Sequence, residues 1–377
     1  MVKSLLTELL IRISALRNSI AASNLHKSVS ISFRNLTEQR LIDLKIKIEK
    51  SLNRYNLDIP DSANNFYSDY QRFSEELKSI EHYRIQALKR YGKAENYFYF
   101  LVKSLIQEFR LQCSAPMVTS ISSARDYFWI TPDTDLIGVP LGEEGHLINL
   151  PDLVHELSHV IVCYFDSDYP LITRDFKTIV GDFFQREIYD AEDKRRPLKI
   201  QTLLPICRKN WQRGWLVEFT CDLIATYLVG PAYAWTNLKV SASDRPKDIY
   251  YIDSETHPSH EARSRAIIAM LKKMDLVQEA NQIQKEWESI LSFPNYEEPE
   301  HYRLIFPQVL IDKLTDIVFQ SCKEFDFRSY KDQLQSFDLS ISAIMNQSWN
   351  QLMENPGSYA AWEADIVEIL NKRVTSD

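Results

Sequence analysis

Residues Leu150–Phe165 read LPDLVHELSHVIVCYF, and this stretch decides how the rest of the chain is interpreted. It contains His155, Glu156 and His159 in the pattern H-E-x-x-H. In an α-helix, positions i and i+4 lie on one face, so the two imidazoles can bind a single metal ion. Glu156 is adjacent to the first histidine and can act as a general base toward a water on that metal. The stretch therefore predicts a metal-binding helix.

The flanking residues also favour a helix. Asn149 suits the N-cap and Pro151 suits the first turn. An apolar stripe lies roughly opposite the histidines, at Leu153, Leu157, Val160 and Tyr164. A competing interpretation is an amphipathic helix with two surface histidines. The motif alone leaves both interpretations open.

The composition is that of a globular protein rich in helices. The chain has 377 residues, of which 45% are hydrophobic, enough for the core of one large domain or two modest ones. Only 8 glycines occur, which predicts few tight turns. The formal net charge is -8, and no domain-scale excess of basic residues is present. We therefore expect no nucleic-acid partner.

Cysteine usage and hydropathy indicate the compartment. Five cysteines are scattered without a C-x-x-C pair, which argues against a cysteine zinc site or a disulfide framework and favours a reducing environment. The N-terminal residues lack the apolar region and cleavage site of a signal peptide. No run of about 18 apolar residues occurs, so no membrane span is expected. These observations predict a cytoplasmic protein.

The chain divides into three regions of different character. Residues 1–112 look helical throughout, which predicts a scaffold or a regulatory, partner-binding region. Residues 113–291 contain every motif that carries chemistry. Residues 292–377 return to helical periodicity after a linker, PNYEEPE, at 294–300. The expected fold class is mainly α with a small β-sheet, an α+β arrangement.

The small sheet is expected in residues 113–145. Turn signals such as Pro132–Asp135 separate short runs of β-forming residues, and Pro140 fits an edge strand better than a central one. An edge strand beside the metal could hold an extended peptide, whereas a small hairpin capping the core is the alternative. The runs lie at 117–119, 127–131 and 136–140.

Residues 166–210 form an insert before the next motif. Within it, DAEDKRRP at 190–197 has the composition of a flexible surface loop. Its three basic residues are either a solvated charge run or a contact patch. A mobile lid over the site is a further interpretation of this insert.

A second motif lies in the apolar segment Trp215–Val229, where Glu218 and Asp222 are four residues apart. Their carboxylates project from one helix face. Burying a carboxylate among apolar residues costs several kcal/mol unless it is paired or binds a metal. Glu218 is therefore expected as the third zinc ligand, and Asp222 as the acceptor of a hydrogen bond from a zinc-binding histidine. The competing interpretation is a solvent-facing pair.

A third motif is THPSHEARSRA at Thr256–Ala266, with Arg263 six residues after His257. An imidazole or a guanidinium near the attacked carbonyl can stabilise the oxyanion of a tetrahedral intermediate, so both residues are candidates. His260 is less favoured. The competing interpretation is a helix-starting turn with a structural arginine.

The three motifs together resemble the gluzincin zinc metallopeptidases, and most closely the CaaX prenyl endopeptidase and HtpX-like families. Those families combine H-E-x-x-H, a downstream helix with E-x-x-x-D, and an H-P segment with an arginine six residues after its histidine. The resemblance covers roughly residues 125–270. The best-known members are membrane or envelope proteins, whereas this sequence predicts no membrane span.

The resemblance implies a zincin-like core at 113–291 that binds one Zn²⁺ per chain. It implies zinc ligands at His155, His159 and Glu218, with Glu156 as the base. It also implies that Asp222 orients a zinc-binding histidine, most readily His155. The last motif then supplies His257 and Arg263 to the catalytic centre.

We therefore expect a zinc-dependent endopeptidase. It would hydrolyse protein or peptide substrates through a zinc-activated water, with Glu156 as general base. The alternative is a catalytically silent or latent gluzincin-like protein that serves as a partner-binding or regulatory module, with a regulatory protein as its partner.

Overall fold

The computed structural model describes most of the chain. The described residues are 2–22, 29, 31–54, 60–122, 127–131, 135–168, 171–243, 249–252, 254–292, 298–334 and 340–375. Most of the turn predicted at Pro132–Asp135 and of the linker predicted at 294–300 lies outside them. Within them, the protein is mainly α-helical with a small three-stranded sheet, so the predicted fold class is confirmed.

The protein forms two compact units. The N-terminal unit comprises residues 1–100 and 116–141, and the C-terminal unit comprises residues 101–115 and 142–377. The three regions expected from the sequence have other boundaries, and that division stays a prediction.

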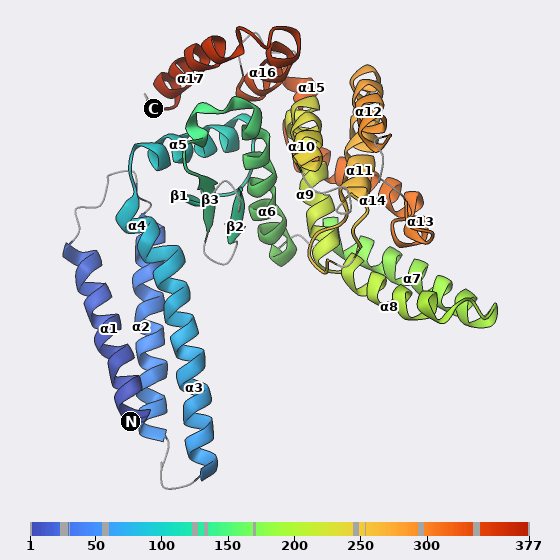
Figure 1. Cartoon of the computed structure of the whole chain (residues 1–377). Coiled ribbons are helices and arrows are strands. Elements are labelled where there is room, and N and C mark those ends of the chain that lie inside the picture. Colours follow the sequence, from blue (N-terminus) through green and yellow to red (C-terminus); the bar gives the residue numbers. More distant parts are fainter. Residues whose placement is uncertain are drawn as a thin grey trace. The chain divides into compact units, whose positions relative to one another are not determined.

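Three long helices make up most of the N-terminal unit (Figure 1). Each of them packs against the other two. A π-helical turn at Ile80–Ile85 joins the third helix directly to α4, so this part of the chain continues without a break in helical structure. The helices are α1 (Val2–Ala22), α2 (Ile31–Arg54), α3 (Pro60–Ser79), α4 (Gln86–Arg90) and the first half of α5 (Lys93–Glu108).

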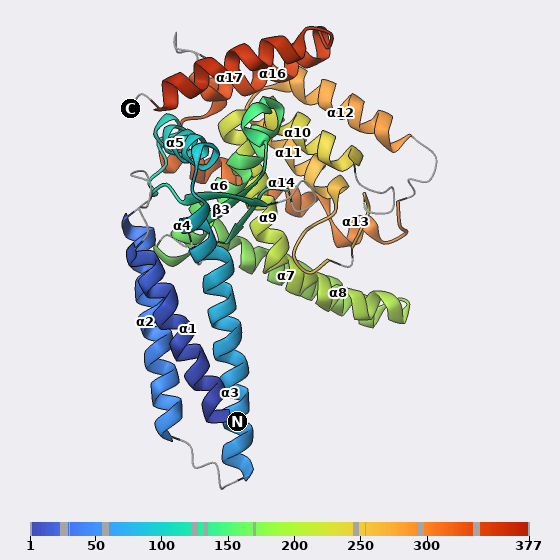
Figure 2. The ribbon, with the colours of Figure 1, turned by 60° about the vertical axis from the view of Figure 1, so that its left-hand side comes forward.

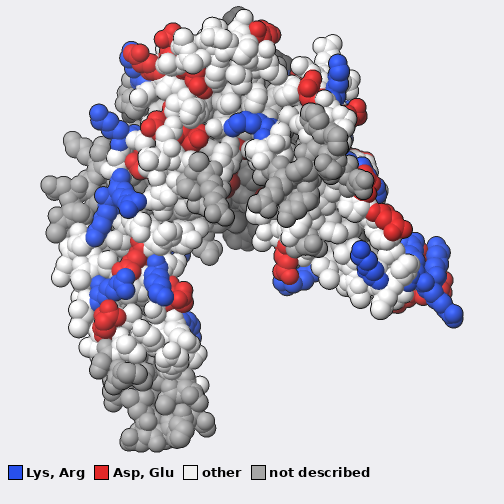
Figure 3. Space-filling model, viewed as in Figure 1, with Lys and Arg blue, Asp and Glu red and all other residues white. Residues whose placement is uncertain are grey.

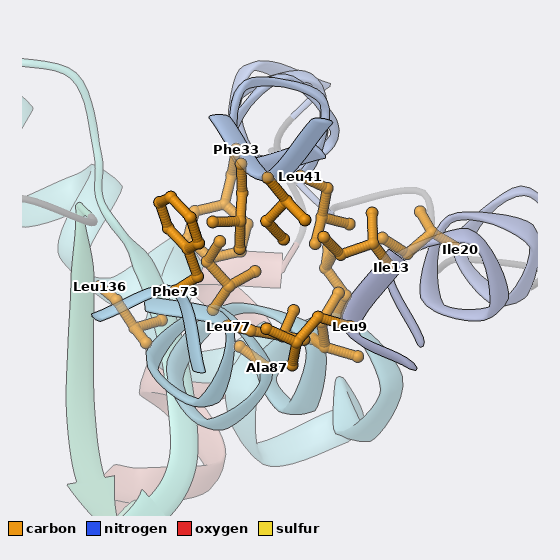
Figure 4. Packing of buried hydrophobic residues seen from close by; sticks show 14 of the residues in the cluster. Leu9, Ile13, Ile20, Phe33, Leu41, Phe73, Leu77, Ala87 and Leu136 are labelled. Atoms are coloured by element: carbon orange, nitrogen blue, oxygen red, sulfur yellow. The ribbon is translucent and has the colours of Figure 1, made fainter. Parts of the chain in front are cut away.

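The core of this unit consists of apolar side chains at helical spacing. Side chains from the three long helices point toward one another, and Leu136 of the sheet joins them (Figure 4). Burial of an apolar stripe on each helix is what holds a bundle of this kind together. Core residues shown in the figure include Leu9, Ile13, Ile20, Phe33, Leu41, Phe73 and Leu77.

The sheet contains β1 (Met117–Ser122), β2 (Trp129–Thr131) and β3 (Leu136–Pro140) in the order β1-β3-β2. β3 pairs in parallel with β1 and antiparallel with β2. The expectation that Pro140 marks an edge strand is wrong, because β3 is the central strand. Pro140 is its last residue, where the pairing with β1 is already irregular and the missing N–H is tolerated.

The C-terminal unit is built around α9 (Gly214–Val229) (Figure 2). Helices α6, α8, α11, α14 and α16 pack against α9, and Gly230 separates α9 from α10. The helices other than α9 are α6 (Leu150–Asp168), α7 (Leu171–Asp193), α8 (Leu198–Trp211), α10 (Pro231–Ser243), α11 (His260–Lys273), α12 (Val277–Leu291), α13 (Tyr302–Ile305), α14 (Gln308–Glu324), α15 (Tyr330–Gln333), α16 (Ile341–Glu354) and α17 (Tyr359–Thr375).

Burial on all sides explains why α9 is apolar nearly throughout. From Trp215 to Val229 its residues are buried, except for the half-buried Val217. A helix enclosed by other helices has no solvated face, so any carboxylate on it must find a compensating charge inside the protein. This requirement applies to Glu218 and Asp222.

The insert between the first two motifs is a helical hairpin of α7 and α8, which lie side by side in both views (Figures 1 and 2). The prediction of a flexible loop at 190–197 is wrong for residues 190–193, because α7 continues to Asp193. Lys194 and Arg196 form ion pairs with Asp190 at 2.6 and 2.5 Å, which stabilises the last turn of the helix. Charges of both signs therefore lie on the hairpin (Figure 3).

Candidate metal centre

The helix predicted from Leu150–Phe165 is confirmed as α6. Of its predicted apolar stripe, Leu153 and Leu157 are buried and Val160 is half-buried, whereas the side chain of Tyr164 lies outside the described residues. Leu153, Val154 and Leu157 are fully enclosed. The ring centroids of His155 and His159 lie 5.0 Å apart, as their spacing of four residues requires. His155 is only 6% exposed and the His159 side chain only 12%. The interpretation as two surface histidines is therefore wrong.

Glu218 of α9 faces both imidazoles. Its carboxylate oxygens lie 3.4 Å from His155 Nε2 and 3.5 Å from His159 Nε2. One ligand atom from each of the three side chains lies within 4.8 Å of the others. The close packing of α6 against α9 brings these groups together. This buried cluster could hold a metal ion.

Asp222 lies one helical turn beyond Glu218 and is fully buried. Its Oδ1 lies 3.1 Å from His155 Nδ1, on the side of the ring opposite Glu218. Arg263 of α11 donates two hydrogen bonds to the Asp222 carboxylate, at 2.8 and 2.7 Å. Both carboxylates predicted on α9 are thus paired inside the protein, and the interpretation as a solvent-facing pair is wrong.

Tyr233 of α10 is a member of the cluster that sequence reasoning missed. Its hydroxyl lies 2.9 Å from His155 Nδ1, donates to Asp222 and accepts from Arg263 Nη2 at 3.3 Å. Its segment, PAYAW, carries no motif, and the tyrosine reaches the cluster because α10 packs against both α9 and α6. No local sequence signal could have identified it.

His257 lies at the rim of the cluster, with a side chain that is 62% exposed. Its Nε2 lies 3.7 Å from a Glu218 oxygen, and its Nδ1 lies 2.8 Å from the Thr256 hydroxyl. Its backbone N–H donates to the Ser254 hydroxyl at 3.0 Å. His260, the less favoured candidate, is the first residue of α11.

A glycine allows the His257 segment to approach α9. A Cβ built on Gly214 would lie 2.7 Å from backbone atoms of Glu255 and Thr256, closer than a side chain tolerates. The next residue, Trp215, donates its indole N–H to the Ser254 carbonyl at 2.8 Å. The start of α9 and the segment before α11 are therefore held together at the backbone, which places His257 beside Glu218.

The pKa values of the metal-free cluster reflect this pairing. Burial opposes the charge on His155, but its hydrogen bonds with Asp222 and Glu218 outweigh burial and raise its pKa to about 10. Burial and the neighbouring His155 charge lower the pKa of His159 to about 4. Burial would raise the pKa of Glu218, yet the two histidines lower it to about 2. The positive charge of His155 and the negative charge of Glu218 thus compensate each other.

Glu156 has a different environment. Burial, with an added contribution from the charges of Glu218 and Asp152, raises its pKa to about 7, although His155 and Arg263 oppose the shift. A carboxyl group with a pKa near 7 can both accept and release a proton close to neutral pH. Among the acidic groups of the cluster, Glu156 is therefore the one suited to proton transfer.

Comparison of the chain with protein-family models, with curated proteins and with solved structures gave no match. Among the described residues, no helix is both long enough and apolar enough to cross a membrane.

Proposed function

We propose that this protein is a zinc-dependent endopeptidase. The observation that carries the proposal is the convergence of His155, His159 and Glu218 from two packed helices, with Glu156 next to His155 on α6. Two imidazoles and a carboxylate form the donor set of catalytic zinc sites, which leave one coordination position free of protein. The resemblance of the three motifs to gluzincins supports the same function.

Zinc fits this donor set better than a hard cation does. Magnesium and calcium prefer oxygen ligands, whereas imidazole nitrogens suit zinc and other transition metals. The Nε2 atoms of His155 and His159 both face Glu218, while His155 Nδ1 lies 3.1 Å from an oxygen of Asp222. The ligand residues would thus be His155, His159 and Glu218. When bound, the metal would lower the pKa of the attacking water and polarise the substrate carbonyl.

Glu156 would carry the proton during hydrolysis. The water oxygen forms a bond to the carbonyl carbon, and the carbon–nitrogen bond of the peptide breaks. Glu156 takes a proton from the water and delivers it to the leaving amine nitrogen, so it returns to its starting state.

The two candidates in the third motif receive different roles. Arg263 directs its donors at Asp222 and Tyr233, so we assign it the positioning of Asp222 in place of the oxyanion contact expected from the sequence. His257 lies exposed beside Glu218 and stays the candidate for stabilising the oxyanion.

The test combines elemental analysis with cleavage of a mixed peptide library by wild type, Glu156→Gln and Glu218→Ala. We expect about one zinc per chain in wild type and Glu156→Gln, and marked loss in Glu218→Ala. Glu156→Gln should lower the cleavage rate by about 10²–10⁴-fold, the usual contribution of a general base.

Glu286→Gln on the exposed face of α12 is the matched control, and its activity should equal that of wild type. Full cleavage by Glu156→Gln would refute the mechanism. Zinc binding without any cleavage in wild type would favour the alternative of a silent or latent regulatory module.

A further inference from the structure

We propose that Tyr233 is a positioning residue of the metal centre, whose hydroxyl holds the His155 ring with Nε2 toward Glu218. The proposal rests on the proposed metal-binding role of His155. It concerns how the ligand is held, and it is independent of which bond the site hydrolyses.

The contacts of the Tyr233 hydroxyl define this role. The oxygen lies 2.9 Å from His155 Nδ1 and 3.3 Å from Arg263 Nη2, and the hydroxyl donates a hydrogen bond to Asp222. The tyrosine and histidine rings are nearly parallel, with 7° between their planes and 5.9 Å between their centroids. Tyr233 thus contacts the ligand, the carboxylate that orients the ligand and the arginine that holds the carboxylate.

The numbers of donors and acceptors determine the direction of each bond. Arg263 can only donate, and ionised Asp222 can only accept. The tyrosine therefore gives its single proton to Asp222 and uses its oxygen lone pairs for Arg263 and His155. His155 Nδ1 must then carry hydrogen, which leaves Nε2 as the atom available to a metal.

The surrounding structure leaves Tyr233 little freedom. The residue is only 1% exposed. Asn346 of α16 fixes the start of α10, since its amide accepts from Ala232 N–H at 3.0 Å and donates to the Val229 carbonyl at 2.8 Å. The C-terminal helices thereby contribute to the geometry of the metal site.

A second buried tyrosine supplies a matched control. Tyr227 of α9 is 3% exposed, and its hydroxyl donates to the Phe327 carbonyl at 3.4 Å, away from the cluster. Tyr233→Phe and Tyr227→Phe remove the same atom from similarly buried rings, but only the first removes a contact of His155.

The first measurement is the zinc dissociation constant of the full-length chain, obtained by competition with a chromophoric chelator. Loss of a hydrogen bond to a metal-binding histidine typically weakens metal binding by about 10–100-fold, and we expect this for Tyr233→Phe. Tyr227→Phe should stay within about twofold of wild type. An unchanged dissociation constant in Tyr233→Phe, or equal losses in both variants, would overturn the proposal.

A second measurement uses wild type alone and requires no metal. A slowly exchanging proton on His155 Nδ1 should give a downfield NMR signal with a nuclear Overhauser effect to the Tyr233 ring. Absence of that proton would also refute the proposal. If wild type binds no zinc, the proposed function fails while this signal still decides the Tyr233 contact. If zinc binds but no peptide is cleaved, only the proposed peptidase activity fails.

Discussion

Two buried arginines, one in each unit of this protein, have surroundings that affect the charged form of the side chain in opposite ways. Arg84 lies in the helical bundle of the N-terminal unit and is fully buried. Arg263 lies in the C-terminal unit with a side chain that is 14% exposed. Both belong to helical segments. Amphipathic spacing alone could not tell which of the two arginines has a carboxylate partner.

A hydroxyl group and an aromatic ring are among the neighbours of Arg84. Its guanidinium donates to the Thr37 hydroxyl at 3.3 Å and stacks over the Phe33 ring at 4.4 Å. Burial, together with the charge of Arg40, lowers its pKa to about 10, although Asp135 opposes the shift. The environment therefore disfavours the charged form of this arginine.

The surroundings of Arg263 have the opposite effect. Burial alone would lower its pKa, but the bidentate contact with Asp222 raises the pKa well above the ordinary value. The comparison teaches that burial by itself does not mark a functional site. A site is indicated where buried charges compensate one another and orient a group that is able to react.

The largest expected effect comes from Arg263→Met. It leaves Asp222 buried without its arginine, and breaking a buried ion pair of this kind costs about 3–5 kcal/mol. Urea unfolding of the metal-free chain should show this loss, and zinc binding should weaken as well. A loss below about 1 kcal/mol would mean that His155 and Tyr233 compensate Asp222 without the arginine.

The second prediction concerns the backbone contact in the C-terminal unit. Gly214→Ala should lower the free energy of unfolding by about 1–3 kcal/mol, because its Cβ meets the backbone of residues 255 and 256. It should also slow peptide cleavage by displacing His257. Gly145→Ala is the control, since its Cβ would have no neighbour within 4 Å. Equal stability of the two variants would contradict the close approach.

The third prediction concerns pH. Metal-free His155 keeps its proton up to a pKa of about 10, and zinc must displace a proton from Nε2. Zinc affinity should therefore rise about tenfold, or about 1.4 kcal/mol, for each pH unit between pH 6.5 and 8.5. A histidine with an ordinary pKa near 6.5 would give a plateau in this range. Chelator competition at several pH values distinguishes the two, and a plateau would show that Asp222 and Glu218 do not hold the proton.

The smallest effect is expected for Arg84→Met in the N-terminal unit. Burial already disfavours the charged form of Arg84 and methionine fills a similar volume, so replacing this charge by an apolar side chain is expected to be nearly neutral. The free energy of unfolding should change by less than about 1 kcal/mol. If this variant loses as much as Arg263→Met, the comparison between the two units fails, because Arg84 would then be compensated as fully as Arg263.

The sequence alone determined the local parts of the centre. The spacing of His155 and His159 places both on one helix face, and the same holds for Glu218 and Asp222, because helical periodicity is a property of neighbouring residues. An apolar helix carrying two carboxylates also indicated that those carboxylates are paired or bind a metal. The mainly helical fold class followed from the same periodicity.

Only the tertiary structure decided which distant residues meet. The central position of β3 depends on strand pairing that no local pattern encodes, as Pro140 shows. Tyr233 reaches His155 because α10 packs against α6 and α9, and Arg263 meets Asp222 because α11 packs on α9. Such contacts depend on packing between helices. The i, i+4 spacing within one helix does not tell which face of a distant helix will pack against it.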